Sequence, residues 1–298
     1  MTPKTRITTI ILTYRRDDAL ADTIARLRPH IAERDDHELL LVDNNADGED
    51  RSALIEGLRG AVITLGGNLG VTGGRNAGIR ASSGDVLVFL DDDAFLEGDV
   101  GTYDRLLERF DSERELGVVS FRSWMRERDQ HDPIEFPHTN KALPRDRAFE
   151  TFRFIGVGHA MRKDAIDRVG LYPESFFYGM EEFEMSFRLM KADYRITYDP
   201  AFTVTHMKAD SGRLVRKDVI ERMYANKLYI AWTHLPLREA LTCASAWGVK
   251  TILDSRDVRS IFRSIMLFTS NVKTERAERS PSCGVVNRIR QLGGVPWK

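Results

Sequence analysis

Cysteine is scarce in this chain of 298 residues, which contains two, Cys243 and Cys283. Two cysteines cannot build the disulfide framework of a small secreted domain, and these two do not form a Cys-x-x-Cys pair. We therefore expect both to be unpaired thiols, as in a protein that works in a reducing cytosol.

Long apolar runs are absent as well. The N-terminal run Ile7–Leu12 is too short for the apolar part of a signal peptide and lacks a cleavage site. The longest weakly polar stretch, 241–253, is interrupted by Lys250 and falls short of the ~20 residues that cross a bilayer. These absences predict a cytoplasmic protein that is soluble or rests peripherally on the inner face of the membrane.

Neither sign of charge dominates, because 44 Lys and Arg oppose 45 Asp and Glu for a net charge of −1. This balance argues against a nucleic-acid-binding protein whose affinity depends on a broad basic field. Hydrophobic residues make up 42% and charged residues 30% of the chain, which excludes disorder as the main state and provides for a core. The length fits one large domain or two small ones.

The first ninety residues contain short apolar runs that alternate with amphipathic segments. Near-continuous apolar runs of this length are typical of strands that are covered on both faces, as in a parallel sheet. The β-α-β-α order predicts an α/β fold, a mainly parallel sheet flanked by helices. The expected strands are Ile7–Leu12, Leu39–Val42, Val62–Leu65 and Val86–Leu90, and the expected helices are 17–33, 49–58 and 68–81.

The rest of the chain predicts further helices and strands around one long loop. The polar segment 122–147 carries three prolines and no sustained period, and loops of that length tend to be functional or mobile. We expect helices at 99–110, 163–169 and 184–191, strands at 117–121, 194–198 and 202–206, helices from Arg213 to about Asn271, and a loosely ordered tail at 272–298.

Ligands of parallel α/β sheets bind beyond the carboxyl ends of the strands, so the residues that follow each strand are candidates for a site. Donors, acceptors, small residues and carboxylates gather there. The four strands lead into Thr13-Tyr14-Arg15-Arg16, Asp43-Asn44-Asn45, the glycine-rich segment 66–78 and Asp91-Asp92-Asp93.

The triplet Asp91-Asp92-Asp93 is the sharpest of these signals. Three adjacent carboxylates are unfavourable unless a cation or hydrogen-bond donors compensate them. Mg²⁺ and Mn²⁺ often join one or two carboxylates to substrate phosphates. The triplet therefore predicts a metal site, with a strand-end turn that caps the next helix as the structural alternative.

The glycine-rich segment allows a helix start to lie close to a ligand or to the sheet. Gly73, Gly74 and Gly78 provide the close approach, and Arg75 would face a phosphate or the Asp triplet. The segment follows the third strand and lacks the G-x-G-x-x-G spacing, which argues against a dehydrogenase.

Two more candidates follow later in the chain. Glu181 and Glu182 lie among aromatic residues at a predicted helix start, where acidic residues are common because of the helix dipole. A carboxylate in a partly apolar setting is also a candidate general base with a raised pKa. His206 closes a strand; a lone histidine is more often structural, but a neutral imidazole also joins carboxylates on metals.

In this order and spacing, the motifs resemble family 2 glycosyltransferases of the GT-A fold. The likeness covers about residues 6–208, and the C-terminal helices match no part of it. It is carried by Thr13–Arg16, Val42–Asn44, Gly74–Gly78, Phe89–Ala94, Val169–Leu171 before Phe176-Phe177, and Glu181–Glu184 leading to Arg188-Leu189.

The resemblance implies an inverting, divalent-metal-dependent enzyme that moves a sugar from a nucleotide-diphosphate donor to an acceptor hydroxyl or amine. It implies a catalytic domain over 1–208, with a nucleotide-binding half over 1–98 and an acceptor-binding half over 99–208, followed by a helical extension over 209–298. A cell-surface glycan, a lipid-linked sugar and a small secondary metabolite stay open as acceptors. A homodimer and peripheral membrane contact stay open as well.

The resemblance also implies residue roles. The base position is usually Asp in the family and is Glu182 here, and a misplacement of ~1 Å can cost a hundredfold in rate. Either the acceptor binds in a different position from that in the family, or Glu181 is the catalytic base. The expected roles are nucleotide and donor binding by Thr13, Tyr14, Arg16, Asp43, Gly74, Arg75, Asp91 and Asp92, binding of Mn²⁺ or Mg²⁺ by Asp93 and His206, and catalysis by Glu182 or Glu181.

Two other functions compete with glycosyl transfer. A nucleotidyltransferase shares the sheet and the acidic metal site, but its glycine-rich loop directly follows the first strand, and 13–18 lacks glycine. A non-catalytic binding protein on a degenerate GT-A fold has Glu182 as its only support, and the intact Asp triplet argues against it.

Overall fold

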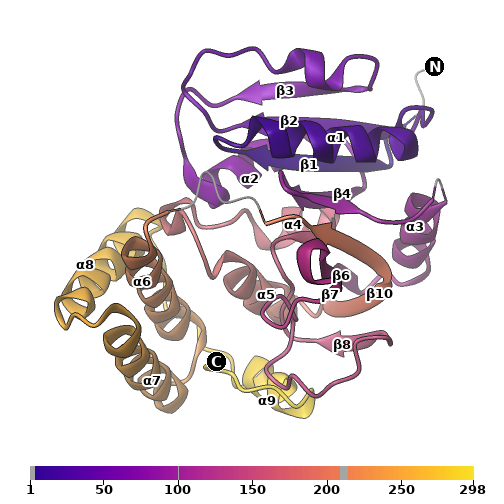
Figure 1. Ribbon diagram of the computed structural model, residues 1–298. Helices are drawn as coiled ribbons and strands as arrows, with labels where there is room; N and C mark the ends of the chain where they lie inside the picture. The colour runs from indigo at the N-terminus through magenta and orange to yellow at the C-terminus, as the bar shows by residue number, and fades with distance from the viewer. Residues whose placement is uncertain (1–3, 100, 209–213) are drawn as a thin grey trace.

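The computed structural model describes residues 4–99, 101–208 and 214–298, and in them the chain forms one ten-stranded mixed sheet with helices packed on both faces (Figure 1). The strands follow the order β3-β2-β1-β4-β9-β6-β10-β5, with β7 paired to β6 and β8 paired to β10. The bounds are β1 (Ile7–Thr13), β2 (His37–Asp43), β3 (Gly60–Thr64), β4 (Val86–Asp91), β5 (Ala94–Leu96), β6 (Leu116–Met125), β7 (Gln130–His131), β8 (Phe149–Thr151), β9 (Gly158–Arg162) and β10 (Arg195–His206).

The first four strands are parallel, as the apolar runs predict. β1 pairs in parallel with β2 and β4, and β2 pairs in parallel with β3, so their carboxyl ends meet at one edge of the sheet. β9 is antiparallel to both β4 and β6, and β10 is parallel to β6 and antiparallel to β5. The predicted α/β sheet with a helical C-terminal part is confirmed.

Each face of the sheet carries its own core because successive side chains of a strand alternate between the faces. Leu87 and Phe89 of β4 face one core, which α2 (Gly70–Ala81), α4 (Lys163–Val169), α5 (Glu181–Lys191) and α6 (Arg216–His234) help to form. Val88 and Leu90 face the other core, which is covered by α1 (Asp17–Ile31) and α3 (Thr102–Ser112).

The helix expected at 49–58 was wrong. The segment forms one turn of 3₁₀ helix, η1 (Ser52–Ile55). The Arg28 side chain of α1 binds the carbonyl oxygens of Leu54 and Glu56, which a longer helix would use internally, and Gly57 then turns the chain with a φ of +76°.

Two other expectations also need correction. The strands predicted at 194–198 and 202–206 form one strand, β10, with a register shift between Asp199 and Thr203. Pro200 lies in this bulge, where its missing N–H breaks no ladder bond. The loop predicted at 122–147 begins later, because β6 continues to Met125 and, after one turn of 3₁₀ helix at Arg126–Arg128, pairs with the short strand β7.

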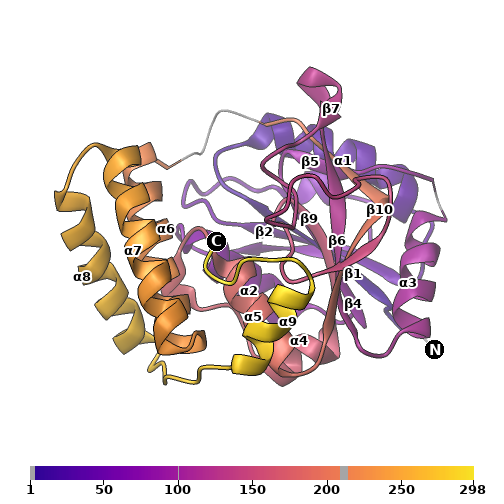
Figure 2. The ribbon, with the colours of Figure 1, turned by 90° about the horizontal axis from the view of Figure 1, so that it is seen from below.

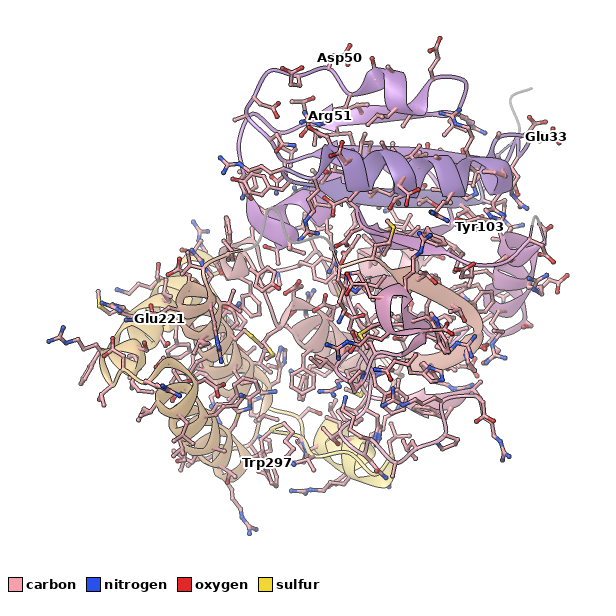
Figure 3. The ribbon with its side chains drawn as sticks, in the orientation of Figure 1. Glu33, Asp50, Arg51, Tyr103, Glu221 and Trp297 are labelled. Atoms are coloured by element: carbon pink, nitrogen blue, oxygen red, sulfur yellow. The ribbon has the colours of Figure 1, made fainter. Side chains whose placement is uncertain are left out.

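The C-terminal part consists of α6, α7 (Leu237–Ser255), α8 (Arg259–Thr274) and α9 (Cys283–Gln291). α7 and α8 pack on the side of α6 that faces away from the sheet (Figures 1 and 2). Glu221 of α6 ties the layers together by accepting hydrogen bonds from Ser260 and Arg263 of α8 (Figure 3). The expected start at Arg213 and the boundary between 208 and 209 involve residues that lie outside the described part of the chain.

The tail expected to be loosely ordered is instead packed on the core. Val285, Val286 and Ile289 of α9 are buried, and Trp247 of α7 donates to the carbonyl oxygen of Trp297 (Figure 3). Among the described residues, none of the helices has the length and apolar character needed to span a membrane.

The packing of α9 leads to a stability prediction. Ile289→Ala should lower the free energy of unfolding by about 2–5 kcal/mol, because it removes buried apolar atoms and leaves a cavity. Urea denaturation measures this change. Asn287→Ala, on the exposed side of the same helix, is the control and should stay within about 0.5 kcal/mol of the unaltered protein. Equal effects of the two changes would contradict the packing of α9 on the core.

Candidate active site

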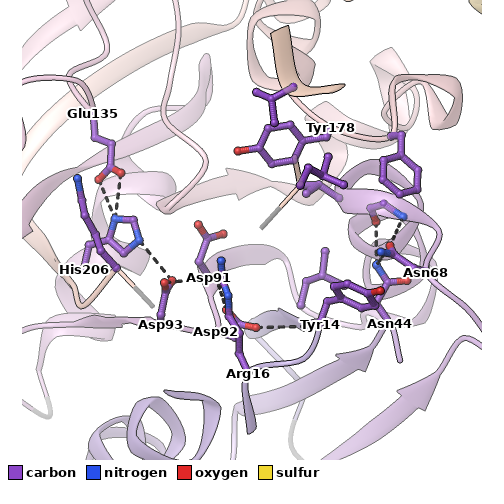
Figure 4. A pocket seen from close by; sticks show the side chains of 17 residues that line it. Tyr14, Arg16, Asn44, Asn68, Asp91, Asp92, Asp93, Glu135, Tyr178 and His206 are labelled. Carbon is purple, nitrogen blue, oxygen red and sulfur yellow. Dashed lines mark hydrogen bonds and ion pairs between the residues drawn. The ribbon is translucent and has the colours of Figure 1, made fainter. Parts of the chain in front are cut away.

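A cavity of about 460 Å³ opens at the edge of the sheet where β1, β2 and β4 end (Figure 4). Tyr14, Asn44 and Asp91 follow or end these three strands and line it. Leu214 and Val219, which precede and begin α6, complete the wall. The cavity therefore lies where ligands of parallel α/β sheets are expected, with a contribution from the C-terminal helices.

Asp91, Asp93 and His206 meet at one side of this cavity. Each offers one ligand atom, and these atoms lie within 4.8 Å of one another. The strand register explains the meeting, because His206 of β10 pairs with Ala94, directly after the Asp triplet. His206 Nε2 lies 3.3 Å from Asp93 Oδ1, so the two residues predicted as metal ligands are neighbours (Figure 4).

Glu135 lies behind His206 and fixes its ring. A carboxylate oxygen of Glu135 lies 2.9 Å from His206 Nδ1, so that Nε2 is left to face Asp93. Burial alone lowers the pKa of His206, but the hydrogen bonds to Asp93 and Glu135 raise it to about 10. Glu135 was not predicted; the only sequence signal for it was its position in the long proline-containing segment 122–147.

Asp92 points away from the cluster and holds the segment after β1. Its carboxylate accepts hydrogen bonds from Arg16 Nη1 at 2.9 Å and from the backbone N–H of Tyr14 at 3.3 Å. Burial raises the pKa of Asp92 to about 6, although Arg16 opposes that rise. Arg16 also lies 3.3 Å from Asp93, so one guanidinium compensates two of the three adjacent carboxylates.

The residues expected to hold the nucleotide base divide into two groups. Tyr14 lines the cavity, whereas Thr13 and Asp43 are buried and do not line it, and Asp43 binds Arg51 at 2.8 Å and Asn45. Asn44 and Asn68 line the cavity instead, and Asn44 donates to Asn68 Oδ1. Both asparagines lie in segments that follow predicted strands, which was the signal that could have identified them.

Gly74 lies against the sheet. A Cβ at Gly74 would come within 2.3 Å of Leu12 Cδ1, so the glycine allows α2 to pack closely on β1. The adjacent Arg75 is buried and its guanidinium binds Glu182 at 2.9 Å, Asp91 at 3.4 Å and the carbonyl oxygen of Gly156. Burial opposes the charge of Arg75, but Glu182 and Asp91 raise its pKa, so it stays a cation.

Glu181 and Glu182 begin α5 with different environments. The side chain of Glu181 is 5% exposed and lies 3.6 Å from Arg75, whereas that of Glu182 is 17% exposed and lies 2.9 Å from Arg75. Burial, followed by the charge of Glu182, raises the pKa of Glu181 to about 8. Glu181 is therefore largely protonated at neutral pH, and one of its oxygens has no hydrogen-bond partner among the described residues.

The turn before α5 has an unusual backbone. Phe177 (φ 59°), Gly179 (φ 83°) and Met180 (φ 71°) all have positive φ values, which L side chains rarely adopt. Such a backbone persists only where its surroundings hold it, and it often marks a functional segment. Tyr178, between these residues, lines the cavity (Figure 4).

Asn226 of α6 holds this turn. Its Nδ2 donates to the carbonyl oxygens of Phe176, Tyr178 and Gly179 at 3.2, 3.1 and 2.8 Å. Asn271 of α8 donates in turn to Asn226 Oδ1 at 3.0 Å. The C-terminal helices thus determine the backbone that places Tyr178 in the cavity and begins α5, a role that no local motif around Asn226 indicates.

Comparison with solved structures shows which known fold this chain shares. A mannosyltransferase from Pyrobaculum calidifontis, solved in complex with GDP-mannose and Mn²⁺, matches with a TM-score of 0.57 at 14% identity over 97% of this chain and 80% of that one. The architecture is that of the GT-A glycosyltransferases.

Comparison with protein families is more specific. The model of glycosyl transferase family 2 matches residues 8–170, more than half of the chain, and the protein belongs to this family of glycosyltransferases. An uncharacterized protein of Haemophilus influenzae is 30% identical over 179 residues, which are 57% of this chain and 94% of that protein. The uncharacterized glycosyltransferase YwdF of Bacillus subtilis is 25% identical over 214 residues, which are 70% of this chain and 76% of that protein.

The raised pKa of Glu181 predicts a pH-dependent stability. Because its folded-state pKa lies above the ordinary value of 4.5, its contribution is full below pH 4.5 and is lost as the pH rises to about 8. Glu181→Gln, which cannot lose a proton, should therefore gain at least about 1 kcal/mol of stability relative to the unaltered protein between pH 5 and pH 8.

Urea denaturation at the two pH values measures this difference. Glu278→Gln, at an exposed position, is the control and should leave the pH dependence unchanged. A pH dependence that is the same in Glu181→Gln and in the unaltered protein would contradict the assigned protonation of Glu181.

Proposed function

We propose that this glycosyltransferase is a metal-dependent inverting enzyme that uses a nucleotide-diphosphate sugar as donor and an acceptor hydroxyl or amine. The observation that carries the proposal is the cluster of Asp91, Asp93 and His206 at the mouth of the cavity, with Glu135 behind the histidine. The Mn²⁺ in the related mannosyltransferase structure supports it.

The cluster fits a divalent cation by its donor set. Carboxylate oxygens and an imidazole nitrogen suit Mn²⁺, and carboxylates alone suit Mg²⁺. A carboxylate behind a ligating histidine is the usual second partner of its ring, and Glu135 occupies that place. Asp93 and His206 would hold the metal, with Asp91 beside them. When bound, the cation offsets the negative charge that develops on the departing diphosphate.

Donor binding would use the part of the cavity between β1 and β2. Tyr14 offers an aromatic face, and the side-chain amides of Asn44 and Asn68 offer donors and acceptors for a nucleotide. Arg16 and Lys208 line the same cavity and are cations suited to phosphate oxygens. In this proposal, Thr13, Asp43 and Gly74 act through the backbone and the sheet that carry these groups.

Glu182 is the proposed base. It is more exposed than Glu181, and Arg75 joins it to Asp91, which lines the cavity, whereas Glu181 is largely protonated and cannot accept a proton. Glu182 would take the proton of the acceptor as that group attacks the anomeric carbon from the face opposite the diphosphate. A single displacement of this kind inverts the anomeric centre.

The acceptor would approach from the side of residues 99–208 and the C-terminal extension. Phe177 and Tyr178 provide an aromatic wall, and Leu214 and Val219 provide an apolar one. This division assigns residues 1–98 to the donor, 99–208 to the acceptor and 209–298 to acceptor choice. Glycan, lipid-linked sugar and small-molecule acceptors fit this wall equally well.

A screen of nucleotide-diphosphate sugars tests the proposal directly. Donor hydrolysis and transfer to simple acceptors would be measured with Mn²⁺, with Mg²⁺ and with a chelator. We expect turnover of at least one donor that depends on the metal, with an inverted anomeric centre in the product. Retention of configuration, or equal turnover with a chelator, would overturn the corresponding part of the proposal.

Asp93→Asn should weaken metal-dependent binding of the nucleotide diphosphate by at least about tenfold, because it removes a charged ligand from the cluster. Isothermal titration calorimetry of the nucleotide with and without Mn²⁺ measures this loss. Asp146→Asn, at an exposed position outside the cavity lining, serves as the control. Unchanged metal-dependent binding in Asp93→Asn would exclude this carboxylate as a ligand.

Glu182→Gln should retain donor binding yet lower the transfer rate by about 10²- to 10⁴-fold, the usual contribution of a general base. Steady-state transfer assays and nucleotide titrations separate the two effects. Glu181→Gln should transfer at a rate close to that of the unaltered enzyme. The opposite order of the two variants would assign the base to Glu181.

A further inference from the structure

The two outer helices of the C-terminal part, α7 and α8, each expose a row of large apolar side chains. The row on α7 is Leu237, Leu241, Val249 and Leu253. The row on α8 is Val258, which directly precedes the helix, Phe262 and Met266. These seven side chains, here called the α7–α8 face, are each between 59% and 71% exposed.

The spacing shows how each row runs over its helix. Val258, Phe262 and Met266 are four residues apart and lie along one side of α8, whereas Leu237, Leu241, Val249 and Leu253 wind over the exposed half of α7, because each step of four residues turns by about 40°. The opposite sides of α7 and α8 pack on α6. Scattered exposed apolar residues are ordinary, but contiguous rows mark an interaction site.

Basic side chains accompany these rows. Arg238 lies beside Leu237 and Leu241, Arg256 follows the end of α7, and Arg259 lies between Val258 and Phe262. None of these three guanidinium groups is paired with a carboxylate of the described residues. The nearby acidic groups are used elsewhere, since Asp254 binds Lys250 and Asp257 binds Lys217. The α7–α8 face is therefore apolar and positively charged.

We propose that the α7–α8 face docks on the surface of an anionic lipid bilayer, with α7 and α8 lying in the plane of the interface. Apolar rows that enter the headgroup region together with Lys and Arg that meet anionic lipids are the features of helices that bind there. Each basic residue near such a surface contributes attraction that salt screens.

Charge distinguishes this occupant from a second copy of the chain. In a symmetric dimer the same patch meets itself, which would bring the patch that carries Arg238, Arg256 and Arg259 in one copy against the equally positive patch of the other. An anionic surface compensates these charges instead. The inference does not depend on the reaction, because it uses no residue of the cavity.

Co-sedimentation of the full chain with vesicles tests the proposal. Vesicles of phosphatidylcholine with phosphatidylglycerol should bind the protein at least about tenfold more tightly than vesicles of phosphatidylcholine alone, and added salt should weaken this binding. The double variant Phe262→Ser/Met266→Ser and the double variant Arg256→Glu/Arg259→Glu should each weaken it by about tenfold.

Matched controls lie on the catalytic part of the chain. Ile134→Ser removes an apolar side chain that is 80% exposed, and Arg147→Glu reverses an exposed charge; both should leave vesicle binding unchanged. Circular dichroism and thermal melting confirm that the variants are folded. Absence of binding to the anionic vesicles, or equal losses in the controls, would overturn the proposal. A dimer in light scattering that Phe262→Ser/Met266→Ser dissociates would also overturn it and assign the face to a second copy.

Discussion

Asp91, Asp92 and Asp93 place three negative charges on consecutive residues at the end of a buried strand, and the surrounding elements are arranged to compensate them. Arg16 from the end of β1 meets Asp92 and Asp93, and Arg75 from α2 meets Asp91. His206 arrives from β10 on the other side. Side chains from distant parts of the chain therefore compensate the negative charge of the triplet together. A divalent cation would add to this compensation.

The features of the fold and site that could be predicted from the sequence are those that short stretches of the chain determine by themselves. Apolar runs of β-branched residues predict the four parallel strands, and the rule that ligands bind beyond their carboxyl ends locates the cavity. The pairing of Asp93 with His206 came from the resemblance to family 2 glycosyltransferases and not from a local pattern. The helical period also predicted α1, α2, α4 and the C-terminal helices α6 to α8, although it could not say which of their faces would be covered.

The rest depended on contacts between distant residues. Glu135 supports His206 from a loop with no regular pattern, and Asn226 acts on a turn 47 to 50 residues earlier in the chain. η1 stays short because Arg28 donates to carbonyl groups that would accept backbone hydrogen bonds in a longer helix. α9 is a helix because Ile289 and its neighbours find a core, which no property of a short polar tail indicates.

The three hydrogen bonds of Asn226 make the C-terminal helix α6 a structural part of the candidate active site. The side-chain amide of Asn226 donates to the carbonyl groups of Phe176, Tyr178 and Gly179, so α6 supplies part of the framework that places α5. The extension is accordingly not a separable module, and cutting the chain after the last strand would release the segment that carries Tyr178 and both glutamates. α6 therefore folds together with the catalytic sheet, whereas the α7–α8 face lies outside this hydrogen-bond network.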